Sequence, residues 1–188
     1  MLKVLLVDDE PFILQGLKVL VDWQKEGYEI AGSASNGEEA LEFLEKNEVD
    51  LIIADIKMPV MTGLELLEKI RNENKTSAYF VFLSGYADFN YAKEAIRHKC
   101  TEYILKPVQV EELLSVLRRV TKMHHVVEEK RKDDKKMEQA FLARNMIAVI
   151  QGKYDNLNLE YVKKHIPEIS TFLLNINNSF FNKNKEVF

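Results

Sequence analysis

Short runs of apolar residues recur five times along the first 105 residues of the chain. The runs are rich in β-branched or aromatic side chains, and several are apolar at consecutive positions, as in parallel strands that are buried on both faces. We therefore predict five β-strands, at residues 3–7, 28–31, 51–54, 79–83 and 103–105.

The segments that separate and follow these runs have apolar residues three or four positions apart, which is the spacing of one face of a helix. The residues at this spacing are Ile13, Leu17, Leu20 and Val21, then Ala40, Leu41 and Leu44, then Leu66, Leu67 and Ile70, then Phe89, Ala92 and Ile96, and finally Val110, Leu113, Leu117 and Val120. Strands that alternate with helices predict an α/β fold with a doubly wound parallel sheet and helices on both faces. In such folds ligands bind outside the carboxyl ends of the strands.

The pattern changes after Thr121. Residues 128–136 are all charged, which is typical of a solvated linker or of a continuing helix. Amphipathic helical spacing returns at residues 137–150 and again at 159–166. We predict a domain at 1–121, a charged linker or helix continuation at 122–136, and a small helical extension at 137–188.

Apolar residues also flank the charged run. Val120, Met123 and Val127 precede it, and Met137 and Phe141 follow it, at positions compatible with a coiled-coil seam. The charged gap leaves fewer than the roughly three to four sustained heptads that a coiled coil needs. The sequence therefore supports dimerisation there only weakly.

Composition narrows the class of protein. Hydrophobic residues make up 46% of the 188 positions and charged residues 30%, which is enough apolar material for a folded core. The apolar opening, residues 1–7, is cut by Asp8, Asp9 and Glu10, far short of the roughly 20 residues of a membrane span, and no signal-peptide pattern follows. The single cysteine, Cys100, cannot form an internal disulfide. We expect a cytoplasmic protein without a membrane segment.

The charge is unevenly distributed. Residues 1–121 carry 14 basic and 21 acidic residues, whereas residues 122–188 carry 12 basic and 9 acidic ones. An acidic first part argues against nucleic-acid binding there, because phosphate contacts need clustered Lys and Arg.

Polar residues follow four of the five predicted strands. Asp8 and Asp9 follow the first, Asp55 the third, Ser84 the fourth and Lys106 the fifth. Parallel strands place all of these residues at one edge of the sheet. Three carboxylates close together repel one another unless a cation neutralises them, and hard oxygen ligands suit Mg²⁺. The sequence therefore predicts a Mg²⁺-dependent site for phosphoryl transfer.

These motifs resemble the receiver domains of two-component response regulators. The resemblance rests on Asp8-Asp9-Glu10, on Asp55-Ile56-Lys57-Met58-Pro59 with Gly63, on Ser84-Gly85, and on Tyr103 with Lys106-Pro107, and it covers residues 1–121. It implies a flavodoxin-like sheet of five strands in the order 2-1-3-4-5.

The resemblance also implies a role for each residue of the acidic site. Asp55 is expected to take a phosphoryl group from a phosphohistidine of a sensor histidine kinase. Asp9, Asp55 and the backbone carbonyl of Lys57 are expected to hold Mg²⁺, with Asp8 acting through a water molecule. Lys106 is expected to pair with the phosphoryl oxygens.

Signalling is expected to follow from two further residues. The resemblance implies that Ser84 moves toward the phosphoryl group, which Ser84 and Gly85 help to bind, and that Tyr103 fills the vacated space. This change would reshape the face formed by the fourth helix, fifth strand and fifth helix, through which a phosphorylation-dependent homodimer can form. The chain is expected to be an autocatalytic acceptor and not an enzyme, with slow autodephosphorylation because Lys57 and Tyr86 are bulky. A cis bond between Lys106 and Pro107 is also implied.

The residues that follow the fourth strand suggest a subfamily. Residues 83–89 and 91–95 resemble the receivers joined to AraC-type helix-turn-helix outputs, the YesN-like regulators. The 67 residues after Thr121 show neither a recognition-helix pattern nor a basic patch, so we expect DNA binding only through a module outside this chain, with residues 137–188 as a possible truncated connector.

Two other functions compete with transcriptional control. One is a stand-alone phosphorelay receiver without a DNA-binding output. The other is a Mg²⁺-dependent phosphatase with an aspartyl-phosphate intermediate, resembling the haloacid-dehalogenase group. The spacing disfavours the phosphatase, because that group places its two aspartates two positions apart, whereas Asp8 and Asp9 are adjacent.

Overall fold

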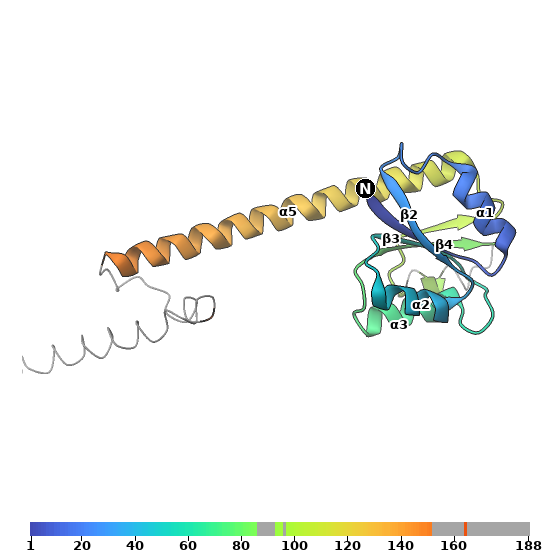
Figure 1. The fold of residues 1–188 in the computed structure, drawn as a ribbon, viewed down its shortest axis with the longest axis horizontal. Helices are drawn as coiled ribbons and strands as arrows, with labels where there is room; N and C mark the ends of the chain where they lie inside the picture. Colours follow the sequence, from blue (N-terminus) through green and yellow to red (C-terminus); the bar gives the residue numbers. More distant parts are fainter. Residues whose placement is uncertain (86–92, 96, 152–163, 165–188) are drawn as a thin grey trace, which may run out of the picture. The chain divides into compact units, whose positions relative to one another are not determined.

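A parallel sheet forms the centre of the fold. The structure, a computed structural model, describes residues 1–85, 93–95, 97–151 and 164, and its sheet has five parallel strands in the order β2-β1-β3-β4-β5 (Figure 1). The strands are β1 (Leu2–Val7), β2 (Tyr28–Ala34), β3 (Leu51–Asp55), β4 (Tyr79–Ser84) and β5 (Glu102–Leu105). The predicted fold class and strand order are confirmed.

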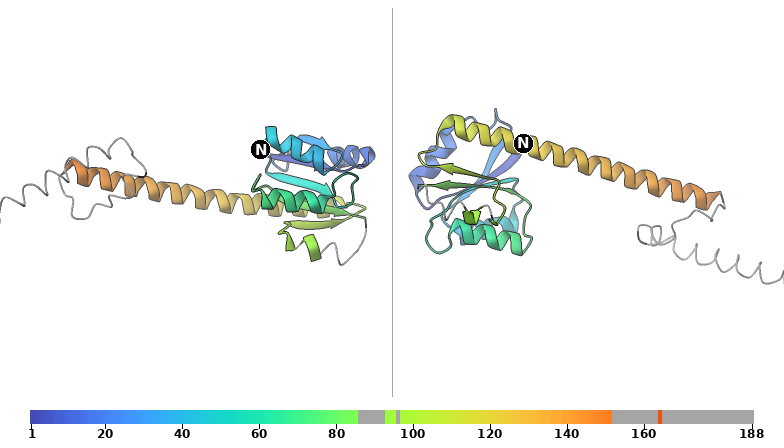
Figure 2. Two further views of the ribbon diagram at one scale, coloured as in Figure 1. Left: turned by 90° about the horizontal axis from the view of Figure 1, so that it is seen from below. Right: turned by 180° about the vertical axis from the view of Figure 1, so that it is seen from behind.

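Helices cover both faces of the sheet. The helices α1 (Pro11–Leu20) and α5 (Val110–Ile150) pack on one face, and α2 (Gly37–Lys46) and α3 (Gly63–Asn72) pack on the other, as Figures 1 and 2 show. Successive strand residues point to opposite faces, so each strand supplies both cores. In β3, Ile52 joins the core under α2 and α3, while Ile53 joins the core under α1 and α5.

Local sequence explains where the helices begin. Pro11 stands at the start of α1, where its missing N–H is no loss. The Asn36 side chain accepts a hydrogen bond from the backbone N–H of Glu39 at the start of α2. Thr62 and Glu65 form a reciprocal capping box at the start of α3. All three helices begin after the loops that border the carboxyl ends of β1, β2 and β3.

One strand is longer than its apolar run. The prediction for β2 ended at residue 31, whereas the strand continues through Gly32 and Ser33 to Ala34. This strand lies at the edge of the sheet and alternates between exposed and buried positions, so its second half needs no continuous apolar sequence.

The last described helix is a single element of 41 residues. Residues 128–136 lie inside it, as do residues 137–150, which the periodicity predicted as a separate helix. By contacts the chain divides into two compact units, residues 1–126 and residues 127–188. No helix in the described part of the chain is long and apolar enough to cross a membrane.

Two predicted helices fall largely or entirely outside the described residues. Of the expected fourth helix, residues 93–95 and 97 are helical, and residues 89–92 and 96 are not described. The helix predicted at 159–166 also lies outside the described residues, apart from residue 164.

Candidate active site at the carboxyl ends of the strands

The polar residues that follow the strands meet at one end of the sheet. Asp8 follows β1, Asp55 is the last residue of β3, and Lys106 follows β5. The strand order makes β1, β3, β4 and β5 consecutive, so three separate segments of the chain converge there.

Lys106 lies between two buried carboxylates. Its Nζ is 2.6 Å from Oδ1 of Asp55 and 2.8 Å from Oδ2 of Asp8. Asp8 is fully buried and Asp55 is 6% exposed. A charge removed from water needs a partner, and here one ammonium serves two carboxylates.

Backbone donors hold the other two carboxylate oxygens. The N–H of Lys57 donates to Oδ2 of Asp55 at 2.7 Å, and the N–H of Glu10 donates to Oδ1 of Asp8 at 2.9 Å. Each carboxylate is thus fixed by one backbone N–H and one ammonium, which restricts its orientation.

Burial and charge shift the pKa values of this cluster. Burial raises the pKa of Asp55 above its ordinary value, and the hydrogen bond and charge of Lys106 oppose that rise only in part. Burial by itself would lower the pKa of Lys106, but its bonds to Asp55 and Asp8 outweigh this effect and raise it. The ammonium is therefore a permanent positive charge at the site, and with both carboxylates ionised the three groups carry a net charge of −1.

The loop after Asp55 is tightly packed. The N–H of Gly63 donates to the carbonyl oxygen of Ile56 at 3.0 Å. A Cβ at position 63 would collide with the carbonyl oxygen of Asp55 and would lie 3.1 Å from the ring of Phe82. Glycine is required here because the loop passes directly over the end of β3.

A family comparison identifies this arrangement. The family model described as response regulator receiver domain matches residues 4–118, which include every residue of the site. The chain belongs to the response regulator receiver family. This family membership favours the receiver function over the phosphatase function, the alternative that the sequence left open.

Curated relatives of this receiver are regulators of transcription by name. The chain is 37% identical over 146 residues to the uncharacterized transcriptional regulatory protein YesN of Bacillus subtilis, covering 78% of this chain and 38% of that protein. It is 35% identical over 122 residues to the transcriptional regulatory protein HptR of Staphylococcus aureus, covering 65% of this chain and 47% of that protein. The chain thus spans less than half the length of these relatives.

Solved receiver structures share the fold. The receiver domain of AraT, a response regulator from Geobacillus stearothermophilus, is 35% identical with a TM-score of 0.63, covering 68% of this chain and 98% of that one. A two-component transcriptional regulator AraC from Clostridium phytofermentans is 29% identical with a TM-score of 0.59, covering 65% of this chain and 94% of that one.

The predicted switch residues lie on β4, which neighbours the strand of Asp55, and on β5 beyond it. Ser84 is a buried residue at the end of β4, and its carbonyl oxygen accepts a hydrogen bond from the N–H of Lys106 at 2.8 Å. Tyr103, on β5, is partly buried and packs against the core under α2 and α3. Gly85 is exposed, with open space where a side chain would begin.

The Lys106–Pro107 peptide bond is cis, as the resemblance implied. Tyr86 lies outside the described residues.

The predicted metal ligands are placed differently from one another. Asp8 and Asp55 both form a salt bridge with Lys106, whereas the Asp9 side chain is exposed. The backbone N–H of Lys57 donates a hydrogen bond to Asp55. Within residues 1–85, 93–95, 97–151 and 164, no group of three or more His, Cys, Asp or Glu side chains is gathered so that it could hold a metal ion. The donor types nevertheless fit Mg²⁺, because carboxylates and a peptide carbonyl are hard oxygen ligands and the cluster retains a negative charge.

The loop after Asp55 also contacts the start of α2, at residues that the sequence did not single out. The N–H of Gly37, the first residue of α2, donates to the carbonyl oxygen of Met61 at 3.1 Å. The Met61 side chain also lies directly against Gly37, so that a Cβ there would meet it. The available signal was the capping pair Asn36 and Glu39, which marks the start of α2.

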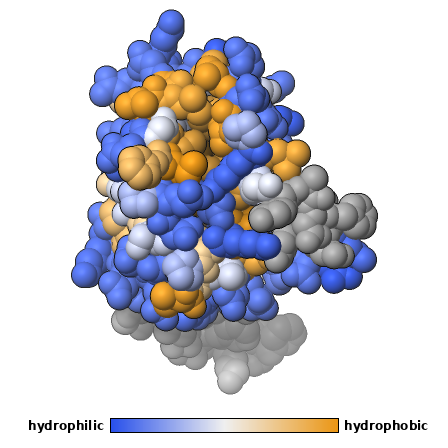
Figure 3. Space-filling view, turned by 90° about the vertical axis from the view of Figure 1, so that its right-hand side faces the viewer, coloured by the Kyte–Doolittle hydropathy of each residue, from blue (hydrophilic) through white to orange (hydrophobic). Residues whose placement is uncertain are grey.

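Apolar surface borders the hydrophilic end of the receiver. Figure 3 views the end toward which the strands point and shows a patch of apolar residues beside charged ones. The exposed apolar residues of the elements that begin or end there include Phe12 of α1, which is 90% exposed, and Leu105 of β5 and Val110 of α5, which are less exposed.

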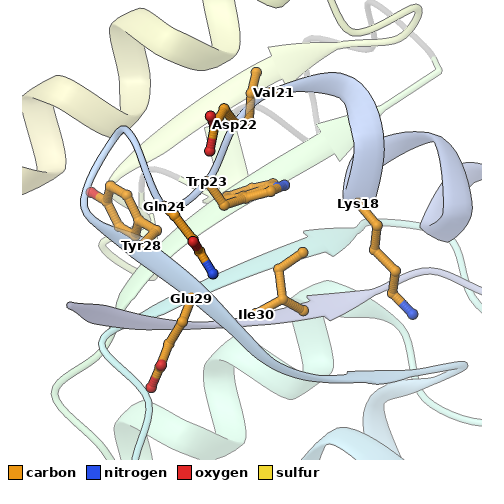
Figure 4. A pocket seen from close by; sticks show the side chains of 8 residues that line it. All are labelled: Lys18, Val21, Asp22, Trp23, Gln24, Tyr28, Glu29 and Ile30. Atoms are coloured by element: carbon orange, nitrogen blue, oxygen red, sulfur yellow. The ribbon is translucent and has the colours of Figure 1, made fainter.

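A separate pocket lies at the opposite end of the sheet. It has a volume of about 390 Å³ and lies between the end of α1 and the start of β2 (Figure 4). Its two large aromatic residues already have hydrogen-bond partners: Trp23 Nε1 donates to the carbonyl oxygen of Leu17, and Tyr28 Oη donates to that of Leu117. The polar atoms of both aromatic side chains are therefore satisfied without a ligand.

Proposed function

We propose that Asp55 accepts a phosphoryl group from a phosphohistidine of a sensor histidine kinase. The observation that carries this proposal is the position of the Asp55 carboxylate, which lies at the end of β3 between the Lys106 ammonium and the Lys57 N–H. A buried carboxylate with a fixed cation beside it suits a nucleophile whose product is a more highly charged phosphoryl group.

The transfer needs few groups from the protein. A carboxylate oxygen of Asp55 attacks the phosphorus atom, the bond from phosphorus to the imidazole nitrogen breaks, and its electron pair returns to the imidazole, which takes up a proton. Phosphoryl transfer passes through a loose, in-line transition state, so positioning and charge stabilisation do most of the catalysis. Lys106 supplies a positive charge beside the incoming oxygens, and Asp8 keeps the Lys106 ammonium at the site.

Mg²⁺ completes the proposed site. Asp9, Asp55 and the carbonyl of Lys57 would hold the ion, with Asp8 acting through water. The ion would supply the positive charge that the cluster of carboxylates lacks.

The response is proposed to involve Ser84 and Tyr103. Their places at the end of β4 and on the neighbouring β5 support this role, because both strands adjoin the site and β5 is the outer strand. Movement of Ser84 toward the phosphoryl group would shift Tyr103 and favour a homodimer through the fourth helix, β5 and α5.

The output is proposed to be transcription. The names of the two curated relatives support it, and DNA contact would come from a module outside this chain, in the cytoplasm. Within residues 1–121 the excess of acidic residues leaves that task to another part of the regulator.

The test is acceptance of a phosphoryl group from a small donor. The chain is incubated with acetyl phosphate and Mg²⁺, and the intact mass is measured. We expect a gain of one phosphoryl group that Asp55→Asn abolishes and that the control Asp133→Asn, an exposed aspartate on α5, leaves unchanged. Labelling that persists in Asp55→Asn would contradict the assignment, and so would a wild-type chain that stays unlabelled with Mg²⁺ present.

A further inference from the structure

The sequence contains one Asn-Gly pair, Asn36-Gly37, at the junction of β2 and α2. In such a pair the backbone nitrogen of the glycine can attack the amide carbon of the asparagine side chain, because glycine has no side chain that hinders the approach. The attack expels ammonia and closes a succinimide ring, which water opens at either carbonyl to give aspartate or isoaspartate. Asn36 is therefore the asparagine whose chain neighbour favours deamidation most.

The fold needs both residues of this pair for reasons unrelated to that chemistry. Asn36 Oδ1 accepts a hydrogen bond from the backbone N–H of Glu39 at 3.0 Å and so caps α2. Gly37 is buried, and a Cβ at its position would meet the side chain of Met61. These two structural requirements together place a reactive dipeptide at the start of α2.

Hydrogen bonds restrain both reacting groups in the folded receiver. Asn36 Nδ2 donates to Oε1 of Glu39 at 3.2 Å and to Oγ of Ser35 at 3.3 Å. Oε2 of the same Glu39 carboxylate accepts from the N–H of Ser35 at 2.8 Å. The N–H of Gly37 must lose its proton before its nitrogen can attack, and it donates to the carbonyl oxygen of Met61 at 3.1 Å. Ring closure therefore requires these bonds to open first.

We propose that Asn36 is a deamidation site that its bonds to Glu39 and the Gly37–Met61 bond keep slow, and that it reacts when the start of α2 opens. Helix ends open locally at a lower free energy than the whole domain unfolds, so the reaction does not need an unfolded chain. The proposal is independent of phosphoryl transfer at Asp55.

The two products differ in their effect on the receiver. Aspartate keeps the side-chain oxygen that caps α2. Isoaspartate adds one methylene to the main chain before Gly37, so the Gly37 N–H cannot keep both its place in α2 and its hydrogen bond to Met61. Because Met61 lies in the loop between Asp55 and α3, the isoaspartate form disturbs the loop beside the acceptor.

The experiment follows the tryptic peptide of residues 26–46 by mass spectrometry, because Asn36 is its only side-chain amide. The full chain is kept at mildly alkaline pH, either folded or in guanidinium chloride, and the gain of about one dalton is measured over time. The protection ratio is the rate in the denatured chain divided by the rate in the folded chain. We expect a ratio of at least about ten for the wild type.

Two variants of neighbouring glutamates provide a matched comparison. Glu39→Ala removes the carboxylate that holds Asn36 and Ser35, and we expect it to lower the protection ratio at least about threefold. Glu38→Ala removes an exposed carboxylate that makes none of these bonds, and it is expected to leave the ratio unchanged. Because the ratio is taken within each variant, direct effects of the substitution on the chemistry cancel.

Three results would overturn the proposal. The first is a wild-type chain that deamidates at Asn36 equally fast when folded and when denatured. The second is an equal change of the protection ratio in Glu39→Ala and Glu38→Ala. The third is a folded Glu39→Ala chain in which Asn36 stays unmodified while the denatured chain reacts.

Discussion

The Nζ of Lys106 lies 2.6 Å from Oδ1 of Asp55, so the residue after β5 reaches past the end of β4 to the end of β3. The two residues are 51 positions apart in the sequence: Asp55 is the last residue of β3, and Lys106 follows β5. The same ammonium also neutralises Asp8, so the ion pair holds three segments of the chain together at the site.

Removal of this ammonium should destabilise the fold. Lys106→Met leaves two buried carboxylates without a cation, which we expect to lower the free energy of unfolding by about 3 kcal/mol at neutral pH. Urea denaturation followed by circular dichroism measures the loss. Adding Asp8→Asn to Lys106→Met should recover part of it, because one of the two repelling charges is gone; losses that simply add would contradict the shared role of Lys106.

Ser84→Ala should separate phosphoryl acceptance from response. The hydroxyl is proposed to move only after Asp55 is modified, so the variant should still gain a phosphoryl group from acetyl phosphate. Its phosphorylation-dependent change of mass in solution, measured by light scattering, should be weakened. A full response in Ser84→Ala would remove Ser84 from the switch.

Gly63→Ala should disturb both the fold and the acceptor. The added Cβ would meet the carbonyl oxygen of Asp55, so we expect a loss of about 2 kcal/mol and slower phosphorylation. Gly16→Ala serves as the matched control, because position 16 lies within α1 with open space around it. Alanine there should stabilise the chain by about 0.5–1 kcal/mol. Equal effects at the two positions, measured by urea denaturation, would contradict the packing argument.

The loop after Asp55 also contains a residue in a strained conformation. Val60 has a φ of 68° and is 74% exposed, and a β-branched residue is unfavourable in the left-handed region. Val60→Asn should raise stability by about 1 kcal/mol, because asparagine tolerates this conformation. The control Val19→Asn changes a valine that is 81% exposed in α1 and should have little effect on the thermal midpoint. A lower thermal midpoint in Val60→Asn would show that the valine side chain is needed there.

Tyr28 should make the fold sensitive to alkaline pH. Burial raises the pKa of this phenol, and its Oη donates to the carbonyl oxygen of Leu117 at 2.7 Å. Between the unfolded pKa of about 10 and the higher folded pKa, the native state holds more protons than the unfolded state, so stability falls as pH rises. Tyr28→Phe should cost about 1 kcal/mol at neutral pH through the lost hydrogen bond. That difference should shrink above about pH 10 in urea denaturation, and a difference that stays constant up to pH 11 would contradict the assignment.

The sheet and the cluster of Asp8, Asp55 and Lys106 could be predicted from the sequence for one physical reason. Buried parallel strands need continuous apolar runs, and parallel strands bring the residues after each run to one edge. Which of two adjacent aspartates turns inward is a different matter: Asp8 is buried and Asp9 exposed, and two carboxylates of equal chemistry carry no sequence signal for that choice.

Other features depend on tertiary context or are ambiguous in the sequence. A charged run such as residues 128–136 suits a linker and a solvated helix equally well, so its continuous helical conformation could not be read from composition. The left-handed backbone at Val60 contradicts the local preference of valine, and it lies in a loop that a hydrogen bond from the Gly63 N–H to the carbonyl oxygen of Ile56 closes.

The hydrogen bond from the Gly37 N–H to the carbonyl oxygen of Met61 gives this receiver a natural spectroscopic reporter. The amide proton belongs to α2, whereas its acceptor belongs to the loop that carries Asp55 into α3. The chemical shift of this amide and its exchange with deuterium therefore depend on the conformation of the loop between Asp55 and α3, although the amide itself belongs to α2. Nuclear magnetic resonance of this one amide can follow the chemistry at Asp55 without a label at the site itself.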